Sequence, residues 1–245
     1  MKKNNRIWIY FLATIGLVLV FANGCKKDSN NSSQSGGLIF NPSLTYGTVT
    51  DIDGNVYKTI SIGTQTWMAE NLRVARYRNG DSISKITDAT PWSNLTAGAY
   101  CIYLNNTDNG ATYGKLYNWY SLIDSRNICP TGWHVPTDTE WETLYAYLGG
   151  YAAITSDKMR ETGITHWAYI NDGATNASGF TAIPGGMRDY GGLFTDVGQM
   201  GFWWSSAPAG DYYNLDAVYY YLDNSGVSRG VGSKKNGMSV RCVKN

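Results

Sequence analysis

Few side chains in this sequence could carry out catalysis. The only histidines, His134 and His166, are too few for a histidine-rich metal site, and each is better explained as a hydrogen-bonded loop residue. The chain has neither a Gly-x-Ser-x-Gly nucleophile elbow nor a phosphate-binding glycine loop. The sequence therefore argues against nucleophilic hydrolysis and nucleotide chemistry.

Paired carboxylates are the remaining catalytic option. Glycosidases hold two acids about 5 to 10 Å apart, and these acids are distant in sequence. Glu70, Glu142, Asp189 and Asp211 could form such a pair, but surface or turn positions explain each of them better, since most acidic side chains are solvated. We therefore expect a protein that is not an enzyme, with a carbohydrate hydrolase as one alternative.

Aromatic side chains are the larger surplus of the chain. It has 19 Tyr, 9 Trp and 28 Gly, while charged residues make up 16%, against about 25% in typical proteins. Recognition loops favour such residues, because rigid rings give contact area at a small cost in entropy. Three groups in the C-terminal third form the candidate ligand-binding surface: Met187-Arg188-Asp189-Tyr190, Trp203-Trp204 and Asp211-Tyr212-Tyr213. Because neighbours on a strand point to opposite faces, at least one of Trp203 and Trp204 should be buried.

The N-terminus indicates export. Lys2, Lys3 and Arg6 precede an apolar run from Ile7 to Phe21, and small residues follow it up to Cys25. This pattern is typical of a secretion signal. The run of about 15 residues is shorter than the roughly 20 of a membrane-spanning helix, which makes an anchor helix the weaker alternative. The small residues directly before Cys25 resemble the lipobox of bacterial lipoproteins, which implies that Cys25 is acylated and anchors the protein to a membrane.

Three regions follow from this pattern. Residues 1–24 are the expected lipoprotein signal peptide, 25–37 a flexible Ser/Asn/Gly-rich tether, and 38–245 a single domain. Lys26 to Asp28 resembles a signal for the outer face of the outer membrane, or is simply a solvated part of the linker. We expect an outer-membrane location, on the periplasmic face or the cell surface. The mature chain has 17 basic and 19 acidic residues, and without clustered positive charge we expect no nucleic-acid partner.

The elements that must position these residues are mostly short. Residues 46–50 and 56–62 predict a β-hairpin around an Asp-Gly turn. The acidic residues of this turn could also suggest a calcium-binding loop, but the bidentate Glu that such a loop needs is missing. The clearest helix is 138–148, with Thr137 and Glu140 as a capping box. Weaker helices are expected at about 113–122 and 156–161. Segments 217–222, 227–231 and 238–243 predict a three-stranded meander. This order indicates an α+β domain.

A known family becomes recognisable around the central helix. The sequence resembles the Fibrobacter succinogenes major paralogous domain, a family of exported, often lipid-anchored bacterial proteins. Six segments carry the resemblance: 66–72 (TWMAENL), 113–119 (YGKLYNW), 129–141 (CPTGWHVPTDTEW), 179–186 (GFTAIPGG), 203–206 (WWSS) and 239–243 (SVRCV). Val135-Pro136-Thr137 through Trp141, with Arg241-Cys242, are more distantly similar to the formylglycine-generating enzyme group. That likeness implies a C-type-lectin-like fold, with two or three helices, twisted antiparallel sheets and long irregular loops that serve recognition.

The residues that carry out the chemistry of the formylglycine-generating enzymes are not all present in this sequence. The formylglycine-generating enzymes hold copper between two nearby C-terminal cysteines, and only Cys242 is present there. Three mature thiols, Cys101, Cys129 and Cys242, allow one bridge and leave one over. In an exported protein we expect a Cys129–Cys242 disulfide rather than a metal site. The calcium-binding tripeptides of C-type lectins are also absent, so we expect no cofactor and no metal.

These expectations combine into one hypothesis and two alternatives. The hypothesis is a non-catalytic surface or periplasmic lipoprotein that binds a glycan or a protein through Arg188, Asp189, Tyr190, Trp203, Trp204, Tyr212 and Tyr213. One alternative is an enzyme, either a diverged formylglycine oxidase or a carbohydrate hydrolase. The other is a structural or adhesive surface component.

Overall fold

The structure is a computed structural model that describes residues 37–168, 171–210 and 214–245. Cys25, the expected signal peptide and Tyr212-Tyr213 lie outside the described residues. The architecture is α+β, with three sheets and short helices between them. Within the described ranges, no helix has the length and apolar character needed to cross a bilayer.

The first sheet joins the beginning and the end of the domain. It contains β1 (Gly47–Thr50), β2 (Val56–Ile62), β3 (Gln65–Met68), β13 (Val243–Lys244) and β7 (Trp133–His134), in that order across the sheet. The predicted hairpin of β1 and β2 is confirmed. Its turn is tied by the Asp51 carboxylate, whose Oδ1 accepts hydrogen bonds from the backbone N–H groups of Asp53 and Asn55, both at 2.9 Å. Asp51 therefore acts as a turn residue.

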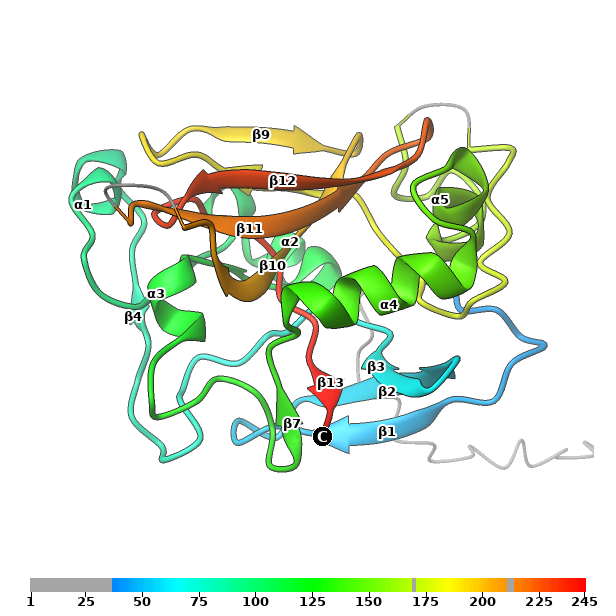
Figure 1. Ribbon diagram of the computed structural model, residues 1–245. Coiled ribbons are helices and arrows are strands. Elements are labelled where there is room, and N and C mark those ends of the chain that lie inside the picture. The colour runs from blue at the N-terminus through cyan, green and yellow to red at the C-terminus, as the bar shows by residue number, and fades with distance from the viewer. Residues whose placement is uncertain (1–36, 169–170, 211–213) are drawn as a thin grey trace, which may run out of the picture. The chain divides into compact units, whose positions relative to one another are not determined.

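The second sheet is formed by five strands from the C-terminal third of the chain (Figure 1). Its strands are β12 (Val227–Ser233), β11 (Asp216–Leu222), β10 (Gly201–Pro208), β8 (Gly185–Arg188) and β9 (Phe194–Val197), in that order. β11 and β12 form the predicted antiparallel pair. The expected third strand of a meander at 238–243 is wrong. This segment crosses to the first sheet, because Val243 pairs with Trp67 of β3 and with His134 of β7.

The helix whose capping residues are close in sequence has the bounds that the sequence predicts, whereas the other two expected helices do not. α4 (Asp138–Leu148) has the predicted bounds and the complete capping box of Thr137 and Glu140. The helix expected at 113–122 is instead divided. α2 (Thr107–Tyr113) ends at Gly114, which has a φ of 82°. Leu116–Tyr117 forms strand β6, and only Trp119–Leu122 is helical, as α3. The helix expected at 156–161 is present as α5, but it covers Ala153–Met159.

Smaller elements surround this frame. β4 (Ser84–Lys85), β5 (Ala99–Cys101) and β6 make a third sheet. α1 (Ala89–Ser93) lies between β4 and β5, and a 3-10 turn at Tyr103–Asn105 precedes α2.

Helix α4 lies between the first and second sheets (Figure 1). One hydrophobic cluster contains Trp67 of β3, Trp141 and Leu144 of α4, and Trp203 and Tyr220 of the second sheet. The Trp141 ring stacks on Tyr220 at 5.1 Å and tilts against Trp67 at 4.8 Å. Aromatic pairs at such distances add to the stabilisation from area burial alone. This cluster orients the second sheet with one face on α4.

Candidate functional site

Arg188 is not available to a ligand. Its side chain is buried, with 1% exposure. Its Nη1 and Nη2 donate to the carbonyl oxygens of Ile86 and Thr87, at 2.9 and 2.8 Å, and its guanidinium lies 4.6 Å from the centre of the Trp92 ring. These hydrogen bonds tie β8 to the chain that leads into α1, so the expected role of Arg188 in ligand contact is corrected to a structural one.

Both Trp203 and Trp204 are fully buried. Successive strand residues point to opposite faces, but here both faces of β10 are covered at this position. The Trp203 indole donates to Asn71 Oδ1 at 2.9 Å, and the Trp204 indole donates to the carbonyl oxygen of Tyr117, also at 2.9 Å. The expectation that these rings contact a ligand is therefore wrong for the described conformation.

The family-like segments meet around one buried arginine. Arg241 is fully buried, and burial lowers its pKa to about 9. It donates to Asn71 Oδ1 and to the carbonyl oxygen of Thr181, both at 2.9 Å, and to that of Phe180. Its guanidinium lies 4.1 Å from the centre of the Phe180 ring. These segments therefore supply the hydrogen-bond acceptors of a buried polar network around Arg241. Without such partners, the buried charge of Arg241 would strongly destabilise the fold.

Asp189 and Tyr190 lie in the turn between β8 and β9. Asp189 Oδ1 accepts a hydrogen bond from the N–H of Leu193 at 2.8 Å and so closes the turn. The Tyr190 side chain is 63% exposed. Since Tyr212 and Tyr213 lie outside the described residues, Tyr190 is the one ring of the predicted surface that the described structure leaves open to solvent.

Sequence reasoning missed a row of side chains on the face of the second sheet opposite α4. Strand register pairs Thr195 of β9 with Met187 of β8, and it aligns Phe202 of β10 with Tyr221 of β11 and Ser228 of β12. The two halves of this row meet where Gly186 of β8 pairs with Gly201 of β10, next to Met187 and Phe202. Thr195 is exposed, Phe202 is buried, and the other three are half-buried. The row carries no charged side chain. With the adjacent Met200, Tyr219 and Gly230, we call it the aromatic face.

The rings of the aromatic face support one another. Phe202 stacks on Tyr221, with centroids 5.8 Å apart and planes at 27°. Tyr219 lies 6.1 Å from Phe202 and 5.9 Å from Tyr221. A Cβ at Gly230 would come within 2.5 Å of the Tyr219 ring, so glycine leaves room for that ring on β12. The signal for this site was the consecutive tyrosines of β11, because tyrosines two residues apart on a strand share a face.

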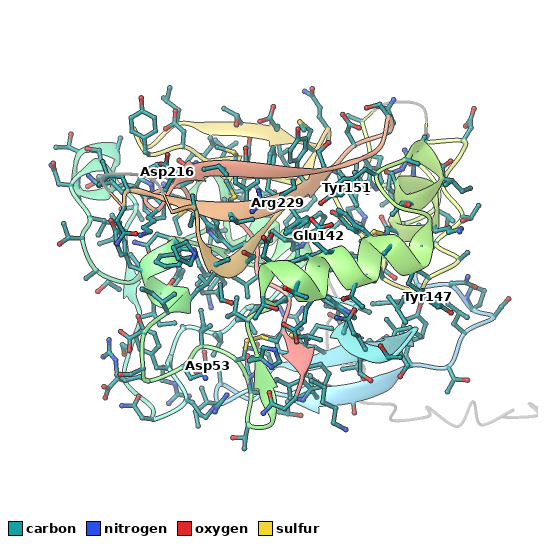
Figure 2. The ribbon with its side chains drawn as sticks, viewed as in Figure 1. Asp53, Glu142, Tyr147, Tyr151, Asp216 and Arg229 are labelled. Carbon is teal, nitrogen blue, oxygen red and sulfur yellow. A yellow bond between two sulfur atoms is a disulfide. The ribbon has the colours of Figure 1, made fainter. Side chains whose placement is uncertain are left out.

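The two carboxylates that come nearest to a catalytic arrangement lie on α4, next to the other face of the same sheet. Asp138 and Glu142, one turn apart on α4, each have an oxygen near the Tyr220 hydroxyl, at 2.6 and 3.0 Å. Glu142, Tyr151 and Arg229 lie together between α4 and the second sheet (Figure 2). Arg229 holds Asp138 in a two-pronged ion pair, with both distances 2.9 Å, and this keeps the pKa of Asp138 below its ordinary value.

This pair does not resemble the acid and base of a glycosidase. The general acid of such an enzyme needs a raised pKa, whereas the arginine keeps Asp138 ionised. Burial raises the pKa of Tyr220, so its hydroxyl stays protonated and can donate to either carboxylate. We interpret the cluster as a cross-link between α4 and the sheet.

The remaining candidate acids have other roles. Glu70 is buried, which corrects the surface or turn role expected from sequence. It accepts a hydrogen bond from the N–H of Lys58 at 2.7 Å and forms an ion pair with Arg73 at 2.9 Å. Asp189 closes a turn, as described, and Asp211 lies outside the described residues.

The histidines and two of the cysteines, Cys129 and Cys242, have structural partners. His134 bonds to Glu140 and His166 to Glu161, at 2.8 and 2.6 Å. Among the described residues, no three His, Cys, Asp or Glu side chains are grouped so that they could hold a metal ion. The Cys129–Cys242 disulfide is confirmed. Cys101 is free and buried, and burial raises the pKa of its thiol to about 12, so it is not a reactive thiolate.

Comparison with known proteins places the chain in a family. The model of the Fibrobacter succinogenes major domain matches residues 60–244, most of the chain. The chain belongs to this family. The matched range of the Fibrobacter succinogenes major domain includes α4, the buried Arg241 network, the disulfide and the aromatic face. Neither a curated protein nor a solved structure gave a match.

Proposed function

We propose that this member of the Fibrobacter succinogenes major domain family is a non-catalytic binding module that docks a protein partner on its aromatic face. The observation that carries the proposal is the row from Thr195 to Ser228. It offers the half-buried Tyr221 ring and Met187 side chain beside the buried Phe202 ring, without charge, across five strands. Tyrosine, phenylalanine and methionine are enriched at protein interfaces, and methionine adapts to irregular partner surfaces.

The catalytic alternatives have less support. Arg229 and Tyr220 already engage the carboxylates of Asp138 and Glu142. A copper site would need a second free thiol beside Cys242, but the cysteine beside it, Cys129, is bonded to it in the disulfide. A structural or adhesive surface role is also compatible with a docking face. One defined protein partner distinguishes the proposed binding module from that role.

The location and the finer fold belong to the same proposal. A disulfide supports an extracytoplasmic location, since such bonds persist in oxidising compartments. We take Cys25 as the acylated residue that anchors the chain at the outer membrane through the tether of residues 25–37. A C-type-lectin-like arrangement is supported by the pairing of the C-terminal strand β13 with β3, near the start of the domain.

Photo-crosslinking in living cells tests the docking face. A photoreactive phenylalanine analogue at Ser228 or Thr195 should give one discrete protein adduct. The same analogue at Tyr147, which is 66% exposed on α4, should not. Tyr147 lies toward the C-terminal end of α4 and packs on the turn at Gly63, so it reports on a different surface (Figure 2).

The rings themselves supply the quantitative test. Truncating an aromatic ring at the centre of a binding surface typically weakens the free energy of binding by about 2 kcal/mol or more. Tyr219→Ala with Tyr221→Ala should therefore weaken affinity for the crosslinked partner at least about tenfold, while Tyr147→Ala leaves it unchanged. The proposal fails if no adduct forms at Ser228 and Thr195, or if the double variant, still folded by circular dichroism, binds that partner normally.

A further inference from the structure

A second candidate site lies beside α3. A pocket of about 420 Å³ opens between the loop that follows Tyr77, the loop before β5, and α3 with the residues after it. This volume lies within the range of small-molecule sites. We call it the α3 pocket and define it by Tyr77, Ser84, Thr96, Gly98, Tyr120 and Arg126. None of these residues belongs to the aromatic face.

The lining of the α3 pocket is rich in hydroxyl groups. Ser82, Ser84 and Thr96 are exposed on its walls, and each hydroxyl can both donate and accept a hydrogen bond. The half-buried Tyr120 ring and the exposed Ile123 side chain give it an apolar border. This combination matches a ligand with hydroxyl groups along its edges and C–H groups on its faces.

The charged groups of the pocket already satisfy one another. Arg126 Nε and Nη2 donate to the two Asp124 oxygens at 2.9 and 2.8 Å, and Nη1 lies 3.2 Å from Asp81. An anionic ligand would meet two carboxylates around one guanidinium. A cationic ligand would meet the guanidinium itself, while the Asp124 oxygens are engaged. The charge arrangement therefore favours a neutral ligand, to which Arg126 can still offer unused N–H groups, since a guanidinium has five.

Tyr77 forms a fixed wall of the pocket. Its side chain is 1% exposed, and its hydroxyl has no hydrogen-bond partner among the described residues. The Arg126 guanidinium lies 4.1 Å from the centre of its ring. The hydroxyl presses on Gly98, where an added Cβ would lie 2.1 Å away. Gly98 therefore leaves room for Tyr77, and the ring in turn positions Arg126 at the pocket.

We propose that the α3 pocket binds a neutral saccharide, with Tyr120 stacked on a sugar face and with Arg126 and the serine and threonine hydroxyls bonded to sugar hydroxyls. This inference goes beyond the docking of a protein partner and does not depend on it.

Ligand-observed NMR of the full-length chain tests the proposal with defined probes. The methyl glycosides of glucose, galactose, mannose and N-acetylglucosamine are the neutral probes, and glucuronate is the anionic one. At least one neutral glycoside should show saturation transfer at about 10 mM or below, a weak affinity that a small site can supply. Glucuronate should bind more weakly than glucose.

Two pocket variants and one control locate the binding. Tyr120→Ala removes the stacking ring, and Ser84→Trp fills the pocket from an exposed position, so each should reduce the affinity at least about tenfold. Tyr147→Ala removes an exposed tyrosine from α4 and should change nothing. The proposal is overturned if no neutral glycoside binds, if glucuronate binds best, or if both folded pocket variants retain wild-type affinity.

Discussion

The Cys129–Cys242 disulfide should be the largest single contribution to stability that one chemical step can remove. It joins residues 113 apart in sequence, one in the loop that leads to β7 and the other just before β13. In the chain-entropy model, a cross-link that closes a loop of this length stabilises the fold by about 5 kcal/mol, because it restricts the unfolded chain.

Replacing both cysteines by alanine also removes two buried sulfur atoms. Both residues are at most 1% exposed and belong to the same hydrophobic cluster. Each small cavity costs about 1 kcal/mol. The double variant Cys129→Ala/Cys242→Ala should therefore lose about 5 to 7 kcal/mol, a large part of the 5 to 15 kcal/mol that typically stabilises a domain.

Urea unfolding with and without dithiothreitol measures this loss. Cys101→Ala is the matched control, since it deletes a buried sulfur that forms no bridge. It should cost about 1 kcal/mol and leave the sensitivity to reductant intact. If the double variant loses less than about 2 kcal/mol more than this control, the disulfide does not stabilise the fold by restricting the unfolded chain.

Three further predictions follow from the buried groups and the N-terminal signal. Asn71→Ala should cost about 2 to 4 kcal/mol in urea unfolding, because it leaves the Trp203 indole and the Arg241 guanidinium without a shared acceptor; a loss below about 1 kcal/mol would contradict this. Burial raises the pKa of Tyr117 well above 10, so the folded state keeps a proton that the unfolded state releases. Stability should then fall as the pH rises above about 10, and absorbance at 295 nm should show this tyrosine ionising only with unfolding. Cys25→Ala should release the protein from membranes, and an absence of fatty-acid label on the wild-type chain would refute the anchor.

Local sequence signals were enough wherever neighbours in sequence are also neighbours in space. The bounds of α4 were predicted because its capping box lies within four residues, from Thr137 to Glu140. The hairpin of β1 and β2 follows from a short Asp-Gly turn. The Cys129–Cys242 pairing has no local signal, because the two residues are 113 apart in sequence; it was expected from the exported character of the chain and from the places of the two cysteines near the central helix and the final strand.

Tertiary structure alone decided which aromatic residues face solvent. Alternation along β10 shows that Trp203 and Trp204 point to opposite faces, but not that both faces are covered. The Trp203 indole donates a hydrogen bond to Asn71, which is 132 residues away in sequence, and the Trp204 indole donates one to Tyr117, which is 87 residues away. The aromatic face likewise depends on the register of five strands, since one residue of slip would turn Tyr219 and Tyr221 toward α4. The sequence therefore determined the short-range elements and the aromatic content, while long-range packing determined which rings could meet a partner.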